Sequence, residues 1–204
     1  LLYLSNVECE VIIPDSVDWI SIAPATKALE QRSIKLLLEE NKGAAREAVV
    51  TLQNKDASLK LEYTISQEPN HDYQLALERE ALIAIYNALD GDNWTNNDNW
   101  CSDKPISEWW GVYTNGKNVT GLAIEGRVTA NSSKGIFPIE AQNLLHLTHL
   151  NIVSTNLDSF ADGLSFNIIE EVSFLNNVFL HLTELAPIYK GGNLKLFTVG
   201  FNDN

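Results

Sequence analysis

The sequence contains no methionine, only two cysteines, and 14 basic residues against 27 acidic ones. The formal charge of −13 repels phosphate groups, so we predict no nucleic-acid partner. No apolar run approaches the roughly 18 residues that cross a bilayer, so we predict no membrane-spanning segment. Because methionine is absent, we expect a mature product or a piece of a longer chain, in which a signal peptide would not be visible.

Motifs for catalysis are also missing. The sequence has no nucleophile elbow, phosphate-binding loop or metal tetrad, and none of its 4 histidines has a triad-like context. The pairs Glu39-Glu40 and Glu170-Glu171 are adjacent, so on a strand their side chains point to opposite faces. A glycosidase needs two carboxyl groups that converge at roughly 5–10 Å. We therefore predict that the protein is not an enzyme and uses no cofactor or metal.

The cysteines, Cys9 and Cys101, are distant in the sequence and fall in different predicted domains. A disulfide between them would link the two domains. Two buried free thiols, which behave as small apolar side chains, are the favoured alternative.

What is present is typical of a folded protein, with 45% hydrophobic and 20% charged residues. A length of 204 residues exceeds the usual domain size of roughly 100–150, which favours two domains. Short apolar segments with strand-like alternation cover 11–13, 19–22, 33–38, 47–53 and 59–65, separated by turn residues. This pattern indicates an antiparallel sandwich over residues 1–68.

After residue 68 the pattern changes. Residues 69–74, which include Pro69 and Asn70, indicate a linker, and apolar residues at helical spacing between Leu75 and Leu89 predict a helix. We divide the rest into a helical, tryptophan-rich cap over 75–118 and repeats over 119–204.

The repeats follow the template L-x-x-L-x-L-x-x-N-x-L in about four registers, the last of them incomplete. The fourth position of the template is occupied by Leu122, Leu150, Val172 and Phe197, at spacings of 28, 22 and 25 residues. These spacings lie near the roughly 20–29 residues of a leucine-rich repeat. The asparagine of the template, whose amide can satisfy backbone groups in a turn, is replaced by arginine and threonine in the first two registers.

Residues 3–68 contain the short motifs Ser5-Asn6, Asp18-Trp19-Ile20, Asn41, Arg46-Glu47-Ala48-Val49-Val50 and Thr64-Ile65-Ser66-Gln67. On these motifs, the segment resembles the BACON domain family (Bacteroidetes-associated carbohydrate-binding often N-terminal). This resemblance implies an immunoglobulin-like sandwich, for which glycan or mucin binding is proposed.

The rest of the chain is similar to leucine-rich repeat proteins of bacterial cell surfaces, including the helical cap that precedes their repeats. The matching segments are 78–82, 86–87, 90–94, 99–100, 107–109, 111–112 and 119–122. The resemblances together imply a multidomain fold, with an all-β immunoglobulin-like sandwich followed by an α/β leucine-rich repeat solenoid with a helical N-cap.

Two motifs resemble metal sites. Residues 90–98 are rich in Asp and Asn, but a calcium loop would need an oxygen ligand and a glycine where Trp94 and Thr95 stand. His146 and His149 have metal-compatible spacing only on a helix, and no third ligand is nearby. We interpret the first as a structural turn and the second as two solvated side chains.

Five tryptophans are candidates either for the core or for stacking against sugars. We expect Trp19 to be the core aromatic residue of the sandwich and Trp94, Trp100 and Trp109 to pack in the cap. Trp110 is the exception, as a possible sugar-stacking residue.

In a repeat array, the residues that flank the buried strand positions point outward on one face of the sheet. They present a mixed, mildly polar surface that suits a protein or a glycan, such as mucin or polysaccharide. The predicted ligand-binding residues are Glu125, His149, Asn151, Val153, Glu171, Ser173, Leu175 and Thr198.

The sequence thus predicts a non-enzymatic bacterial recognition protein, secreted or at the outer cell surface, or in the periplasm. Two alternatives stay open: a structural spacer within a larger surface protein, and an accessory region of a carbohydrate-active enzyme.

Overall fold

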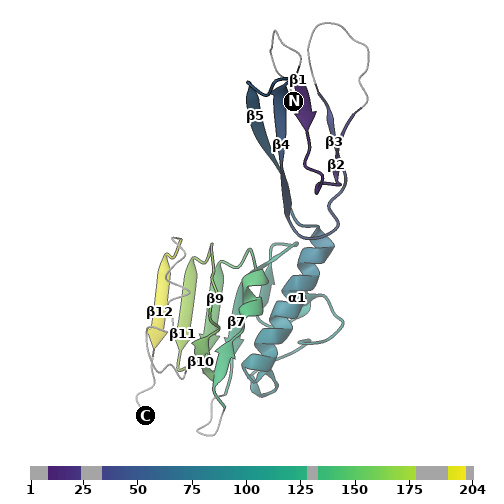
Figure 1. Cartoon of the computed structure of the whole chain (residues 1–204). Helices are drawn as coiled ribbons and strands as arrows, with labels where there is room; N and C mark the ends of the chain where they lie inside the picture. Colours follow the sequence, from purple (N-terminus) through teal and green to yellow (C-terminus); the bar gives the residue numbers. More distant parts are fainter. Residues whose placement is uncertain (1–8, 24–33, 128–132, 178–192, 201–204) are drawn as a thin grey trace. The chain divides into compact units, whose positions relative to one another are not determined.

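The computed structural model describes residues 9–23, 34–127, 133–177 and 193–200. The chain divides into two compact units, Leu1–Tyr73 and Gln74–Asn204 (Figure 1). No helix in the described ranges is long and apolar enough to cross a membrane.

The described residues of the first unit form two antiparallel sheets. The larger has the order β1-β4-β5 and is formed by β1 (Cys9–Ile12), β4 (Arg46–Asn54) and β5 (Lys60–Gln67). The smaller pairs β2 (Ile20–Ile22) with β3 (Leu36–Leu38). These strands fall within or overlap the five segments in which the sequence shows alternation, so the prediction of strands there is confirmed.

The core cluster of the first unit consists of Trp19, Ile20, Ala48 and Val50. Alternate residues of β4 are buried, because one face of the strand lies against this cluster. The expectation that Trp19 is a core residue is confirmed.

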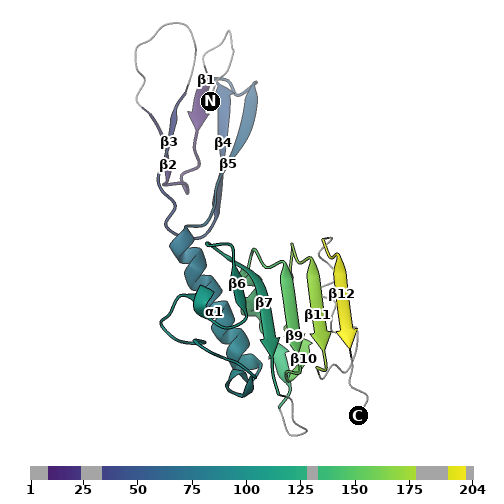
Figure 2. The same cartoon turned by 180° about the vertical axis from the view of Figure 1, so that it is seen from behind.

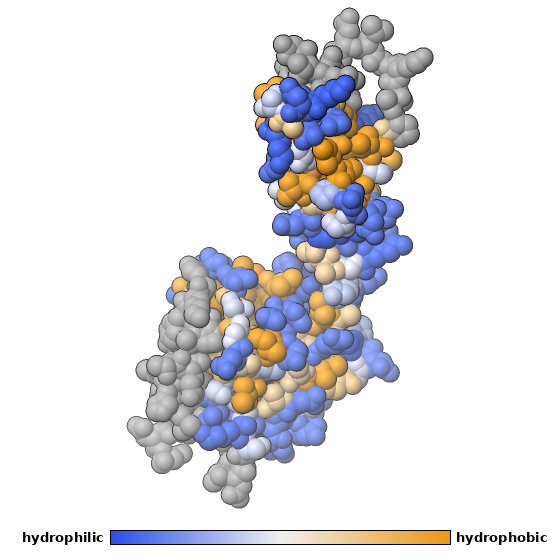
Figure 3. Space-filling model, in the orientation of Figure 1, coloured by the Kyte–Doolittle hydropathy of each residue, from blue (hydrophilic) through white to orange (hydrophobic). Residues whose placement is uncertain are grey.

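Several large apolar side chains of the first unit are exposed, and Figure 3 shows hydrophobic surface over its strands. They are Ile12, Ile22, Leu37, Leu38, Val49, Leu59 and Leu61. The two small sheets therefore bury only a limited apolar core between them.

The second unit is organised around a five-stranded sheet with the order β12-β11-β9-β7-β6. Its strands are β6 (Val112–Thr114), β7 (Val119–Glu125), β9 (His149–Val153), β11 (Glu171–Leu175) and β12 (Leu196–Gly200). All neighbours are parallel except β6, which is antiparallel to β7. Figures 1 and 2 show β7, β9, β11 and β12 side by side in sequence order.

Shorter elements connect these strands. Strands β8 (Gly135–Phe137) and β10 (Leu157–Phe160) form a separate parallel pair. The described 3-10 helices are η1 (Gly91–Asn93), η2 (Ile106–Glu108) and η3 (Ile139–Asn143).

The helix α1 (His71–Ala88) starts inside the segment predicted as a linker. At its first turn, the side chain of Asn70 accepts hydrogen bonds from the backbone N–H groups of Asp72 and Tyr73.

The core of the second unit is much larger than that of the first. It extends from Ala81 in α1, through the tryptophans of the cap, to Phe174 in β11. Glu78 of α1 lies at its edge, fully buried, and accepts hydrogen bonds from the backbone N–H of Val119 (3.0 Å) and the side chain of Asn118 (3.3 Å). This carboxylate joins the helix to the start of β7.

Asn177 joins the ends of neighbouring strands. Its Oδ1 accepts hydrogen bonds from the backbone N–H and the hydroxyl of Thr155, and its Nδ2 donates to the carbonyl of Ile152 at 2.6 Å. The expectation that an asparagine here satisfies backbone groups is therefore confirmed for Asn177. Asn202, the corresponding residue of the fourth register, lies outside the described residues.

The fold class predicted from the sequence is wrong. In place of a multidomain immunoglobulin-like sandwich followed by a leucine-rich repeat solenoid, the described residues form a mixed α/β fold with one helix, several small sheets and no solenoid. The aligned positions Leu122, Leu150, Val172 and Phe197 are direct strand partners. The described connections between these strands differ, however, and a solenoid needs one structural unit that repeats.

The first unit also differs from the fold predicted for it. An immunoglobulin-like sandwich packs about seven strands in two sheets around a shared core. Here β2 and β3 have three residues each, and their pair forms a separate small sheet. Short strands of this kind bury too little apolar surface to build such a core.

Cys9 and Cys101 do not form a disulfide with each other, but the expectation that both are buried is wrong. Cys9 is half-buried, and Cys101 is exposed. Cys101 lies in a turn with a positive φ of 57°, which places it at the surface of the cap.

Candidate binding cleft

An open cleft of about 470 Å³ lies on the exposed face of the five-stranded sheet, at the β6 edge. One wall is the segment from η2 to β6, and the floor is formed by β7 and β9. The lining residues are Ser107, Glu108, Trp109, Trp110, Gly111, Tyr113, Ala123, Ile124, Glu125, Asn151 and Val153.

Trp110 forms an exposed aromatic wall of the cleft. Its side chain is 57% exposed, but its backbone is held on both sides. Its N–H donates to the carbonyl of Asp98 (3.0 Å), and its carbonyl accepts from Nε1 of Trp100 (2.7 Å). The indole is therefore presented to solvent from a fixed backbone, which lowers the entropy cost of binding a ligand.

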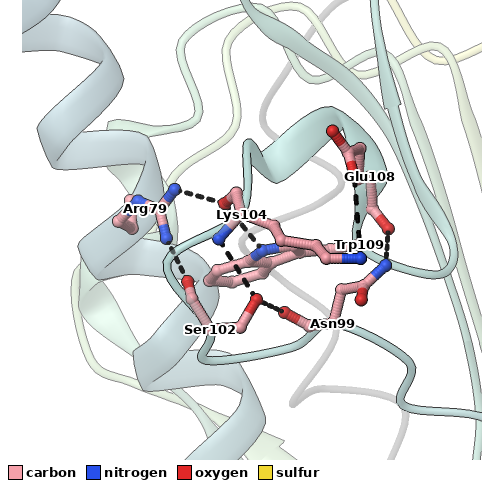
Figure 4. A network of polar contacts seen from close by, with 6 residues as sticks. All are labelled: Arg79, Asn99, Ser102, Lys104, Glu108 and Trp109. Carbon is pink, nitrogen blue, oxygen red and sulfur yellow. Dashed lines mark hydrogen bonds and ion pairs between the residues drawn. The ribbon is translucent and has the colours of Figure 1, made fainter.

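The neighbouring Trp109 points the opposite way, into the core, and is only 2% exposed. The Arg79 guanidinium lies 5.0 Å from its ring centroid and donates to the carbonyls of Ser102 (2.7 Å) and Lys104 (2.6 Å) (Figure 4). Asn99 donates its amide to the carbonyl of Glu108 at 2.7 Å. This network fixes the segment that carries the cleft wall.

Gly111 allows the wall to meet the floor. It has a positive φ of 75°, and a Cβ atom there would lie 2.0 Å from the carbonyl oxygen of Ala123. Its own carbonyl accepts a hydrogen bond from the N–H of Ala123 at 2.8 Å. Only glycine combines this conformation with so close a backbone approach.

Tyr113 is a second exposed aromatic residue of the cleft, with 61% of its surface accessible. It is the strand partner of Gly121, and a Cβ atom at that glycine would lie 3.3 Å from both Cβ and Cδ2 of the tyrosine. The Tyr113 side chain therefore packs over Gly121, which has no side chain of its own.

The polar groups of the cleft include two carboxylates, Glu108 and Glu125, and the amide of Asn151. Nζ of Lys104 lies 3.9 Å from Oε2 of Glu108, which is a long ion pair. None of the residues recorded as lining the cleft is basic. The cleft therefore offers hydrogen-bond acceptors and repels anions.

Beyond the cleft, the open face continues across the strands in rows set by the pairing. Ala123, Asn151, Ser173 and Thr198 form the central row. On one side of this row, His149 and Glu171 are strand partners, with Nε2 of His149 and a carboxylate oxygen of Glu171 3.7 Å apart, and the exposed Leu196 follows on β12. The other side carries Val153 and Leu175, both half-buried.

The structure brings four of the predicted site residues together in the cleft: Trp110, Glu125, Asn151 and Val153. The other five lie on the same sheet but do not line the cleft; they are His149, Glu171, Ser173, Leu175 and Thr198. Sequence reasoning missed Tyr113 and Glu108. The only available signal for Tyr113 was its place in the short alternating segment Val112–Thr114 after a glycine.

The other tryptophans and the histidine pair are as expected. Trp94, Trp100 and Trp109 are buried in the core, as predicted, whereas Trp110 is exposed. His146 and His149 are both exposed, which confirms that they are solvated.

Residues 90–98 form a turn around η1, in which Asn93 donates to the carboxylate of Asp90. The hydroxyl of Tyr86 donates to Asp92 at 2.7 Å. Burial and this hydrogen bond raise the pKa of Tyr86 to about 12. The acidic residues of the segment thus hold the turn together, and no cluster of three possible metal ligands occurs in the described ranges.

Comparison of the chain with family models, curated proteins and solved structures finds no match. The resemblances noted in the sequence therefore stay predictions, and the cleft is the structural basis for a proposed function.

Proposed function

We propose that this chain is a non-enzymatic recognition protein that binds a glycan in the cleft at Trp110. The observation that carries the proposal is the pair of exposed aromatic side chains, Trp110 and Tyr113, in a cleft that also holds carboxylate and amide groups. The apolar faces of sugar rings stack on aromatic rings, and sugar hydroxyls donate to carboxylate and amide oxygens. A few fixed polar groups among aromatic walls are typical of small-ligand sites.

The location in this proposal is outside the cell, at the surface of a bacterium or secreted from it. The sequence resemblance to bacterial surface domains supports this location. A binding protein that meets glycans outside the cell also has no need of the nucleotide or metal motifs that the sequence lacks.

The first experiment is a glycan-array screen of the intact chain with neutral plant polysaccharides and mucin O-glycans. The best-bound glycan is then titrated calorimetrically against the wild type and Trp110→Ala. Because exposed tryptophans at binding sites often contribute most of the affinity, we expect a loss of about tenfold or more. Melting temperatures should be similar, since the indole is largely solvent-exposed.

The matched control is Tyr73→Ala, which removes an aromatic side chain that is 40% exposed and lies in the first unit. This variant should bind like the wild type. An empty array, or equal affinities for wild type and Trp110→Ala, overturns the proposal and favours a spacer. Release of new reducing ends from a bound glycan would contradict the non-enzymatic part.

A further inference from the structure

The cleft opens onto a sheet face whose side chains repeat at the spacing of the strands. The central row runs from Ala123 through Asn151 and Ser173 to Thr198, one residue from each parallel strand. Neighbouring strands are about 4.8 Å apart, so the row extends roughly 14 Å from β7 to β12. Asn151 belongs both to the cleft and to this row, which makes the two surfaces continuous.

Three members of the row, Asn151, Ser173 and Thr198, carry uncharged groups that donate and accept hydrogen bonds. Asn151 and Thr198 are exposed, and Ser173 is half-buried. A ligand that satisfies all three groups must offer hydroxyls or similar groups at regular intervals along a line across the strands.

The two sides of the row differ in a way that also suits a sugar chain. Val153 and Leu175 provide apolar surface on one side, against which C–H faces of pyranose rings can pack. On the other side, His149 and Glu171 form a polar edge over β9 and β11, with Nε2 of His149 and a carboxylate oxygen of Glu171 3.7 Å apart, and the exposed Leu196 ends this edge on β12. A ligand with one apolar and one hydroxylated edge fits between them.

Charge complementarity restricts the ligand further. Glu108 and Glu125 line the cleft, none of its recorded lining residues is basic, and the whole chain carries a formal charge of −13. A chain of uronic acids or sulfated sugars would be repelled, whereas neutral sugars place hydroxyl donors against these carboxylates.

We propose that the ligand is a linear, uncharged polysaccharide that lies across the strands, from the Trp110 cleft over β9 and β11 to β12. This inference depends on the proposed function, because it assumes that the cleft binds a glycan. It adds a second binding region, formed by Ser173 and Thr198, and it predicts the direction in which the polysaccharide crosses the sheet.

The test uses cello-, xylo-, manno- and chito-oligosaccharides of two, four and six units, titrated calorimetrically against the intact protein. In at least one series, affinity should rise from two to six units by about tenfold or more, as added units gain hydrogen bonds. The double variant with Ser173→Ala and Thr198→Ala should bind the disaccharide like the wild type. It should bind the hexasaccharide roughly two- to tenfold more weakly for each lost hydrogen bond.

Thr64→Ala, which removes an exposed threonine from β5 in the first unit, is the matched control and should leave every affinity unchanged. A galacturonic acid hexamer tests the charge: it should bind at least about tenfold more weakly than the best neutral hexamer. Equal binding of this uronate overturns the requirement for an uncharged chain.

The outcomes separate this inference from the proposed function. Disaccharide binding that needs Trp110 but does not strengthen with length overturns the inference and leaves the proposed function in place. If no oligosaccharide of the four series binds, the inference is overturned. The glycan array then decides independently whether the cleft binds another glycan. A length effect that survives in the double variant also contradicts the inference.

Discussion

Each of the two units places an arginine over a tryptophan, and the two contacts have different surroundings. In the first unit, the Arg46 guanidinium lies 4.4 Å from the ring centroid of Trp19 and donates to the carbonyl of Glu39 and the side chain of Gln67. Trp19 is one of the four buried members of the core cluster described for that unit, against which five partly buried apolar residues pack. The arginine therefore covers the ring of the largest side chain in this small core.

In the second unit, the Arg79 guanidinium lies over Trp109, at the edge of a core that extends through the helix and the sheet. Its hydrogen bonds go to the backbone of residues 102 and 104, which lead into the cleft wall. The same interaction thus covers part of a small core in one unit and holds the wall of the candidate cleft in the other. A large core leaves such contacts available to fix surface segments, whereas a small core depends on them for its own stability.

The largest difference in stability between the two units is expected from Glu78→Ala. The substitution leaves the buried N–H of Val119 without its acceptor and creates a cavity beside α1. We expect a loss of about 2–4 kcal/mol in the free energy of unfolding of the second unit. Hydrogen exchange of backbone amides should show faster exchange in β7 and unchanged exchange in β4. Faster exchange in both strands would contradict independent stability of the two units.

The same residue predicts a pH dependence. Burial raises the pKa of Glu78 above its ordinary 4.5, although the hydrogen bonds from Val119 and Asn118 oppose the shift. A carboxyl whose pKa is higher in the folded state binds more protons there than in the unfolded state. Its contribution to stability is fully present below pH 4.5 and is lost as the pH rises through the folded-state pKa.

Glu78→Gln removes this titration and keeps one acceptor oxygen for Val119. The free energy of unfolding of the wild type, minus that of the glutamine variant, should therefore decrease as the pH rises from 4 toward neutrality, by roughly 1.4 kcal/mol for each unit of raised pKa. Denaturant titrations of both proteins over this range measure the difference. A difference that stays constant or increases with pH would contradict the raised pKa.

The arginine pair gives the next prediction, of intermediate size. Arg46→Ala removes a cation–π contact and two hydrogen bonds, so the first unit should lose about 1–2 kcal/mol. Arg79→Ala should lower the stability of the second unit by a similar amount and also weaken glycan binding several-fold, because the cleft wall loses its anchor. Calorimetric titration of both variants with the best-bound glycan measures the contrast. Equal glycan affinity in the two variants would show that Arg79 does not contribute to binding.

Part of the fold was predictable because it depends on local patterns. Alternation identified the strands of the first unit, the repeat registers identified β7, β9, β11 and β12, and helical spacing identified α1. Burial of Trp94 and Trp109 followed from the tendency of large aromatic residues to fill a core. The alignment of Leu122 with Leu150 corresponds to an observed strand pairing, because equivalent apolar residues face the same core.

The fold class was not predictable from those patterns, since it depends on how the connections between strands pack. The segments between β7 and β11 contain β8, η3 and β10, which do not form a repeated unit. The cleft was only partly predictable for the same reason. Glu125 and Asn151 were expected on one face, but their neighbours Glu108 and Tyr113 reach the cleft through η2 and β6, which the repeat pattern does not cover.

The smallest change is a single methyl group, introduced by Gly121→Ala. The new Cβ would lie 3.3 Å from both Cβ and Cδ2 of Tyr113, closer than ordinary van der Waals contact, so the tyrosine must shift by a few tenths of an ångström. Alanine also gains some stability over glycine in a strand, so we expect a net change in unfolding free energy below about 1 kcal/mol. Glycan affinity should nevertheless fall by about two- to fivefold, because Tyr113 no longer faces the ligand from its present position.

Gly43→Ala is the control, because a Cβ atom there meets nothing within 4 Å and the site lies in the first unit. Thermal melts and calorimetric titrations of both variants separate stability from binding. If Gly121→Ala binds the glycan like the wild type, Tyr113 does not contribute to binding, and Trp110 is the principal aromatic contact. If affinity falls while the melting temperature is unchanged, one methyl group under an exposed ring is enough to alter the site, because the large core beneath holds the sheet in place and lets only the side chain yield.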